Sequence, residues 1–192
     1  MKRKVIRNVI FAFCEWETEQ TYLQCLWAFS KVKIYTPKIG EINVSNFERQ
    51  IDVIWDYLEL YWINKININE YQIKVYYLVD IDTIKTKKEV NLIKEKFEQE
   101  WIKILFSNKN IELFILEHYD YYNKESLDYI KEIKKKEPKY KKWKSLETKK
   151  IFENIIENNL DKMKENHYCP RKFWNIKKIE NKQIFCLFLK NK

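Results

Sequence analysis

Acidic side chains follow three apolar segments of the sequence, close to the point where each segment ends. The four that could do chemistry are Glu15, Asp80, Asp82 and Glu112. Asp80 and Asp82 are two positions apart, so in an extended chain they face the same side and can share a hard cation through oxygen ligands. Clustered carboxylates repel one another unless a divalent cation neutralises them, and Mg²⁺ or Mn²⁺ suits oxygen ligands. The pattern therefore predicts metal chemistry at the ends of these segments.

Three of these acids also have a structural interpretation. Asp80 and Asp82 fit a solvated loop that caps the next helix, and Glu15 with Glu17 and Glu19 fits a solvated helix start. What favours a site is the joint placement of the acids after three apolar runs.

The apolar runs are rich in strand formers and predict the strands that position the acids. They cover residues 9–14, 75–79 and 102–106. Helical periodicity predicts helices over 20–29, 46–63 and 90–101. This alternation predicts an α/β fold, a mostly parallel sheet flanked by helices, with a ligand site at the carboxyl ends of the strands.

The rest of the chain predicts a helical, lysine-rich extension. Helices are expected over 111–123 and 146–165, and a final strand over 184–189. Between the helices lies the lysine-rich stretch 124–143, where Pro138 interrupts any helix. We divide the chain into an α/β core at 1–125 and a C-terminal extension at 126–192 that packs on the same domain.

The charge of the chain favours an anionic partner. With 37 Lys and Arg against 28 Asp and Glu, the net charge is +9, which makes nucleic acid the first expected partner. An equally weighted alternative is that lysine is simply the default surface residue. The basic stretch around Tyr140 fits contacts to a phosphate backbone with base stacking, or a solvated connector. The expected nucleic-acid contacts are Lys134, Lys135, Lys136, Lys139, Lys141, Lys142 and Trp143.

A single glycine, Gly40, excludes several ways of binding phosphate. Walker loops, dinucleotide fingerprints and kinase phosphate loops all need several glycines. Any phosphate is therefore expected to meet side chains or a metal. The four cysteines form no C-x-x-C pair, which argues against a zinc site of ordinary spacing. The longest apolar runs are far below the roughly 20 residues of a membrane span, and no signal-peptide pattern is present, so we expect a cytoplasmic protein without a membrane partner.

Three segments, in a fixed order, resemble the RloB-like family of the Toprim (topoisomerase–primase) superfamily. They are Phe11 to Leu23, with an acid and then a Thr-Glu pair after an apolar run; Val75 to Asp82, with its D-x-D; and Ile102 to Tyr119, which is similar to S-N-P-x-F-E-x-W-x-L-x-H-F. Trp16 stands where the family has glycine, and Lys109 where it has proline.

The resemblance implies a Toprim-like core with metal-dependent phosphodiester chemistry. It makes Glu15 the acid–base group at the metal site, Asp80 and Asp82 ligands of Mg²⁺ or Mn²⁺, and Glu112 a further acid of that site. The implied function is a nuclease acting on DNA or RNA in antiphage defence, beside an ABC-type or AAA-like ATPase partner. A homodimer is left open.

Glu19 and His118 are additional site candidates. Helix capping accounts for Glu19 and a structural hydrogen bond for His118 comparably well. A second hypothesis, motivated by Trp16 and the basic stretch, is a non-catalytic nucleic-acid or partner-binding module with a degenerate Toprim site. A small-nucleotide phosphotransferase is the weakest alternative, because no phosphate loop is present.

Overall fold

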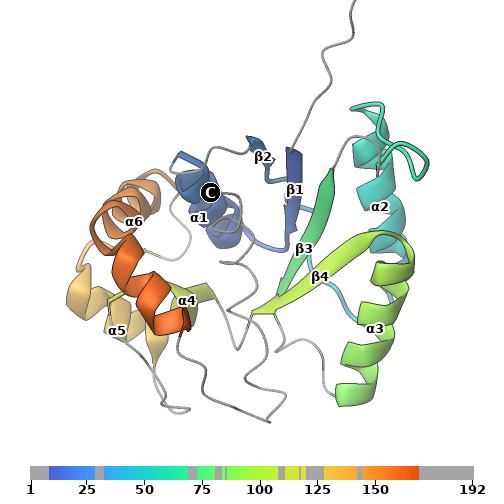
Figure 1. Cartoon of the computed structure of the whole chain (residues 1–192). Coiled ribbons are helices and arrows are strands. Elements are labelled where there is room, and N and C mark those ends of the chain that lie inside the picture. Colours follow the sequence, from blue (N-terminus) through green and yellow to red (C-terminus); the bar gives the residue numbers. More distant parts are fainter. Residues whose placement is uncertain are drawn as a thin grey trace, which may run out of the picture.

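The computed structural model contains a four-stranded parallel sheet with helices on both faces (Figure 1). Its strands are β1 (Val9–Cys14), β2 (Lys33–Tyr35), β3 (Lys74–Asp80) and β4 (Ile102–Ser107). Its helices are α1 (Glu17–Ala28), α2 (Phe47–Glu59), α3 (Lys87–Gln99), α4 (Ile111–Leu116), α5 (Tyr129–Lys136) and α6 (Ser145–Tyr168). The structure describes residues 9–28, 33–68, 73–80, 84, 86–107, 111–116, 118–119, 128–141 and 145–168. The predicted α/β class with a parallel sheet is confirmed.

The strand order creates a point where the sheet reverses its winding. The order is β2-β1-β3-β4, and all neighbouring pairs are parallel. From β1 the chain forms β2 on one side, and it then crosses back to form β3 on the other side of β1. In parallel α/β sheets, ligands bind outside the carboxyl ends of the strands at such a reversal. Cys14 pairs with Leu78, so β1 and β3 end at nearly the same level.

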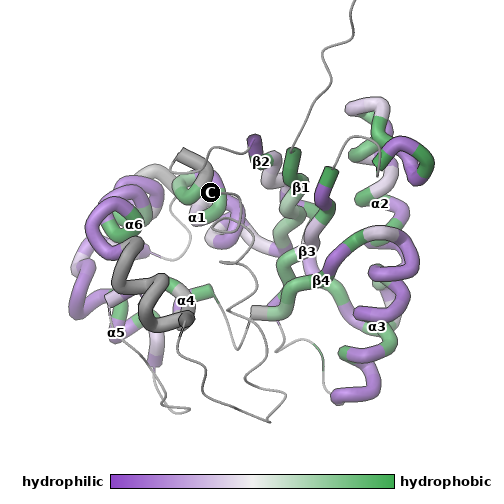
Figure 2. Tube along the Cα trace, viewed as in Figure 1, coloured by the Kyte–Doolittle hydropathy of each residue, from purple (hydrophilic) through white to green (hydrophobic). Residues whose placement is uncertain are grey.

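Alternate strand residues point into two separate cores. Phe11, Phe13 and Tyr77 lie in the core covered by α2 and α3, whereas Ala12 and Cys14 lie in the core covered by α1, α4, α5 and α6. Figure 2 shows the apolar strands between helices with largely hydrophilic outer faces. Because both faces of the sheet are covered, its central strands are continuous apolar runs.

Two helices end earlier than the periodicity predicts. The structure ends α2 at Glu59 and α3 at Gln99. Trp62 and Trp101, which fall within the two predicted helix ranges, have φ angles of 60° and 62° and are exposed. A right-handed helix requires negative φ, so both tryptophans lie beyond the helix ends.

The helical layer made by α4, α5 and α6 also differs in detail from expectation. The predicted helix over 111–123 is described as helical only to Leu116, and His118 follows in a turn, where its N–H donates to the Ile115 carbonyl at 3.2 Å. The lysine-rich stretch contains α5, which ends before Pro138. Buried side chains of α5 and α6 share one core with α1. The predicted strand 184–189 lies outside the described residues. No described helix is long and apolar enough to cross a membrane.

Candidate active site

Glu15 lies at the carboxyl edge of the sheet, at the reversal between β1 and β3. Its side chain is 1% exposed. Its Oε1 accepts a hydrogen bond from the N–H of Ile42 at 2.9 Å, and its Oε2 accepts one from the N–H of Asp80 at 2.8 Å. Glu15 therefore joins the loop after β2 to the end of β3. The burial rules out a solvated helix start as the explanation of this residue.

The loop after β2 brings its backbone to Glu15 through Gly40. The N–H of Cys14 donates to the Pro37 carbonyl at 2.9 Å, which extends the pairing of β1 beyond β2. Gly40 then has a φ of +94°, a conformation that glycine adopts without the penalty of a side chain. Two residues later the N–H of Ile42 reaches the Glu15 carboxylate. The only glycine of the chain thus shapes the site without forming a phosphate loop.

Glu19 occupies the N-terminal end of α1. Its Oε2 accepts a hydrogen bond from the N–H of Trp16 at 3.1 Å, and its side chain is buried. Gln20 donates its N–H to the Trp16 carbonyl at 3.2 Å, so the helix begins here. Helix N-termini attract anions because their N–H groups point outward. At α1 a carboxylate of the protein itself already holds this position, as the helix-capping interpretation predicts.

Burial and mutual repulsion raise the pKa values of these acids. Burial is the largest cause of the raised pKa of Glu15, about 9; the charges of Asp80 and Glu19 add to it, while the two backbone hydrogen bonds oppose it. The pKa of Glu19 is raised to about 8, first by burial and then by the charge of Asp80, with a smaller contribution from Glu112. The charges of these acids thus act on one another, and we call the set the acidic cluster: Glu15, Glu19, Asp80 and Glu112.

Tyr140 connects the helical layer to the acidic cluster. It follows α5, is fully buried, and packs its ring 6.2 Å from that of Phe152. Burial raises its pKa most, and the charges of Glu112 and Glu19 raise it further. The expectation that Tyr140 stacks on nucleic-acid bases is therefore wrong, because a ring without exposed surface cannot receive a base. Its proximity to the cluster carries no sequence signal, since the two segments are distant in the chain.

His118 is buried against α1. Its Nε2 forms a 3.0 Å hydrogen bond with the Tyr22 hydroxyl, and the two rings meet edge to face with centroids 5.6 Å apart. The structural interpretation of His118 accounts for these contacts. A catalytic role stays a prediction.

The donor chemistry of the cluster fits Mg²⁺ or Mn²⁺. Asp80 ends β3 and is half-buried, Glu112 is fully buried on α4, and Asp82 lies outside the described residues. Carboxylate oxygens suit these ions, and a cation would oppose the burial and the smaller repulsion that together raise the pKa of Glu15. Among the residues that the structure describes, no three His, Cys, Asp or Glu side chains are placed to hold an ion together.

The lysines expected to contact nucleic acid are exposed where the structure describes them. Lys134, Lys135 and Lys136 form the last turn of α5, and Lys139 and Lys141 follow it. The pair Lys135 with Glu132 spans 2.6 Å, and the pair Lys141 with Glu147 spans 3.5 Å. Lys142 and Trp143 lie outside the described residues. Exposure suits both a nucleic-acid contact and a solvated connector.

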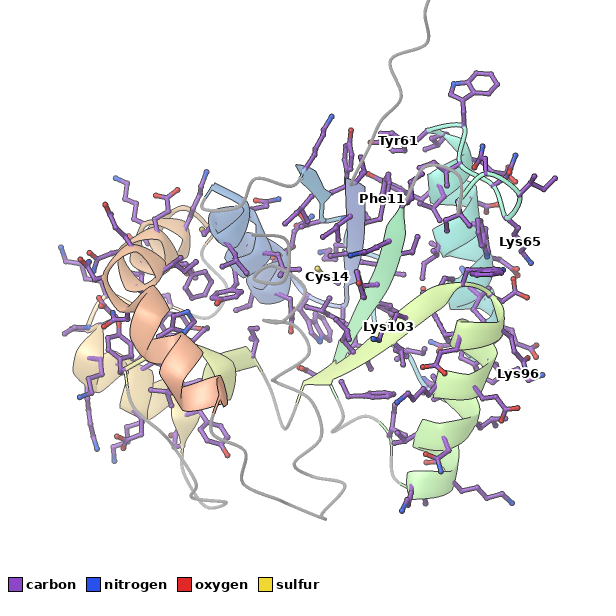
Figure 3. The ribbon with its side chains drawn as sticks, in the orientation of Figure 1. Phe11, Cys14, Tyr61, Lys65, Lys96 and Lys103 are labelled. Atoms are coloured by element: carbon purple, nitrogen blue, oxygen red, sulfur yellow. The ribbon has the colours of Figure 1, made fainter. Side chains whose placement is uncertain are left out.

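Lys38 lies beside Cys14, the residue before Glu15, and was not predicted. It pairs with Cys14 in a parallel bridge, and its Nζ lies 2.7 Å from Glu17 Oε1. Figure 3 shows the side chain of Cys14 pointing from β1 toward α1, the helix that carries Glu17. Nothing in the sequence separates Lys38 from the many other lysines of the chain.

Comparison of the chain with protein-family models, with curated proteins and with solved structures finds no match. A proposal about function therefore depends on the parallel α/β fold and on the acidic cluster at the reversal of its sheet.

Proposed function

We propose that the protein is a divalent-cation-dependent nuclease of the Toprim type, which hydrolyses phosphodiester bonds of DNA or RNA. The observation that carries the proposal is the position of Glu15, a buried acid at the reversal of the sheet, hydrogen-bonded to the backbone of Asp80. This is the position where parallel α/β sheets bind ligands. Glu19 and Glu112 add two more buried acids beside it.

The acids would divide the chemistry between them. Asp80 and Asp82 would hold Mg²⁺ or Mn²⁺, with Glu112 as the further acid of the metal site. A bound cation would stabilise the charge that develops on the phosphoryl oxygens. Glu15 would give its carboxyl proton to the oxygen that leaves phosphorus when the P–O bond breaks. A proton of the attacking water would then restore the carboxyl group, so that the proton balance closes over one turnover.

The resemblance to the RloB-like family supports two further parts of the proposal. It suggests that the nuclease acts as an effector of antiphage defence, with an ABC-type or AAA-like ATPase as its partner. The exposed lysines of α5 and of the segment after it would supply phosphate contacts.

A cleavage assay tests the proposal. The purified chain should cleave single-stranded or duplex DNA or RNA when Mg²⁺ or Mn²⁺ is added, and the double substitution Asp80→Ala with Asp82→Ala should abolish cleavage. The matched control is Asp52→Ala with Asp56→Ala, because these aspartates are exposed on α2. It should cleave like the wild type. Cleavage that survives loss of Asp80 and Asp82 would overturn the assignment.

Two observations favour a second candidate, a non-catalytic nucleic-acid or partner-binding module. The two backbone donors on Glu15 would also suit a purely structural clamp between β1 and β3, and no three metal-ligating side chains converge among the described residues. Such a module should bind nucleic acid with strong salt dependence and without metal dependence. Calorimetric Mg²⁺ binding that is lost in Asp80→Asn would count against it.

A further inference from the structure

A nucleic acid that approaches the carboxyl edge meets several buried acids, so it needs positive groups besides a cation. Two common backbone sources of positive charge are not open to it. Glycine-rich phosphate loops are excluded by the single glycine of the chain. The N-terminal end of α1 already holds the carboxylate of Glu19. A phosphate next to Glu15 would therefore depend on side-chain cations near the site in addition to a bound metal.

Backbone hydrogen bonds fix Lys38 beside Cys14. The N–H of Cys14 donates to the Pro37 carbonyl at 2.9 Å, and the N–H of Ile39 donates to the Cys14 carbonyl at 3.0 Å. Lys38 thus stands beside Cys14 as in neighbouring strands, about 4.8 Å apart. Glu15 is the next residue after Cys14. The same loop goes on to donate to the Glu15 carboxylate, so the position of the lysine is coupled to that of the acid.

The ion pair of Lys38 is suited to exchange. Its Nζ lies 2.7 Å from Glu17 Oε1, and the two side chains are 42% and 53% exposed. Exposed ion pairs of this kind are weak. Lysine carries a compact charge on a flexible stem with three rotatable donors, so it can turn from one anion to another. A phosphate that enters the site would compete directly with Glu17.

We infer that Lys38 binds a phosphate of the nucleic-acid substrate beside Glu15, and that Glu17 holds Lys38 in the free protein. This inference rests on the proposed nuclease function and extends it by naming a substrate-binding residue and its competitor. It requires that Lys38 increases the affinity of the protein for nucleic acid and that Glu17 decreases it.

The inference is tested by the binding of a fluorescently labelled single-stranded oligonucleotide to the full chain, measured by anisotropy without added metal at several salt concentrations. Lys38→Ala should weaken binding about five-fold and reduce the slope of log K against log salt by about 0.7, the value for one phosphate contact on a single strand. Lys38→Arg should retain most of the affinity. Glu17→Gln should tighten binding, because the competitor is removed. In the cleavage assay, Lys38→Ala should raise KM with little change in kcat.

Lys96→Ala is the control for the general loss of one positive charge. Lys96 is exposed on α3, which covers the other face of the sheet (Figure 3). Equal effects of Lys38→Ala and Lys96→Ala would overturn the inference, and so would unchanged binding in Lys38→Ala. In both cases metal-dependent cleavage by the wild type would leave the nuclease proposal standing. A wild-type chain that neither binds nor cleaves nucleic acid would overturn both.

Discussion

The two edges of the sheet differ in which residues adopt left-handed backbone. At the carboxyl edge the positive φ of +94° falls on Gly40, whereas at the opposite edge Trp62 and Trp101 have φ values of 60° and 62°. Glycine adopts this conformation freely, while other residues lose roughly 1–2 kcal/mol. The chain therefore has its only glycine in the loop that holds Glu15, and it tolerates backbone strain at the edge away from the acidic cluster.

The same two edges differ in what they bury and expose. The carboxyl edge buries acids that repel one another, whereas the opposite edge exposes large apolar side chains. These are Leu60 at 74%, Trp62 at 89% and Ile66 at 82% exposed. Glu15 is held by donors 27 and 65 residues away along the chain, whereas the turn that carries Ile66 is held by local bonds between Asn64 and Asn67. The position of Glu15 is thus set by contacts between segments that are distant in the chain.

The largest effect is expected at Glu15. Glu15→Gln should reduce metal-dependent cleavage by about 10²–10⁴-fold, because the amide cannot exchange the proton that acid–base catalysis needs. Initial rates with the same oligonucleotide measure this loss, and thermal unfolding confirms that the variant is folded. Glu48→Gln, an exposed glutamate in the first turn of α2, is the control and should cleave like the wild type. A Glu15→Gln variant with full cleavage activity would contradict the catalytic role of Glu15 and with it the functional difference between the two edges.

The second effect is a loss of stability with rising pH in the metal-free protein. The folded state holds the pKa of Glu15 at about 9 and that of Glu19 at about 8, against an ordinary value of 4.5. Between these values the folded state keeps protons that the unfolded chain releases, so stability falls as pH rises. The charged side chains that shift these two pKa values, Asp80 and Glu112 among them, are all acids, and each of them raises the pKa.

Thermal unfolding in the presence of a chelator at pH 5.5, 7 and 8.5 measures this effect, and Tm should fall by several degrees across the series. Glu19→Gln should make the fall smaller, because one of the two groups no longer titrates. Saturating Mg²⁺ should also reduce it, since the cation favours the ionised acids. A Tm that rises from pH 5.5 to 8.5 would contradict the assignment of buried, protonated glutamates.

The third effect concerns the loop of the carboxyl edge. Gly40→Ala should destabilise the protein by about 1 kcal/mol, because alanine is strained at this φ although its Cβ would have space, with Gln50 Nε2 4.0 Å away. Chemical denaturation measures the change. Glu41→Ala, at the next and exposed position, should change stability by less than about 0.5 kcal/mol. Equal effects of the two substitutions would show that the positive φ is unimportant.

The smallest effect is expected at the opposite edge, with the opposite sign. Trp62→Asn should stabilise the protein by about 0.5–1 kcal/mol, because asparagine tolerates left-handed backbone and little buried apolar surface is lost. Leu60→Asn is the matched control, since Leu60 is also exposed but has a φ of −58°. It should change stability little, and cleavage should be unaffected in both variants. If denaturation shows that Trp62→Asn is less stable than Leu60→Asn, the positive φ of Trp62 is not a source of strain, and the proposed difference in backbone strain between the two edges is wrong.

The parts of the fold that could be predicted are those with a local signal. The runs that form β1, β3 and β4 are recognisable because both faces of the sheet are covered, which makes the strands continuously apolar. The strand β2 escaped prediction because it has three residues, of which only Ile34 is buried. Trp62 was assigned to a helix because its spacing continues that of α2, and only the backbone angle reveals that the helix has ended.

The candidate site was predictable only in outline. Glu15 and Asp80 follow recognisable strands, so their position at the carboxyl edge could be expected. The donation from Ile42, the proximity of Tyr140 and the ion pair of Lys38 depend on contacts between distant segments, which no spacing in the sequence encodes. The sequence alone does not distinguish a buried acid from a solvated one, as Glu15 illustrates: it fits a solvated helix start in the sequence but is buried in the structure.

The central claim is that the carboxyl edge is a divalent-cation site, and the most direct test is a crystal of the full chain soaked in Mn²⁺ and measured for anomalous scattering. The expected result is a peak in contact with a carboxylate oxygen of Asp80, on the side of Glu15, that is absent from a crystal of Asp80→Asn. A Mn²⁺-saturated crystal without a peak at this edge would contradict it.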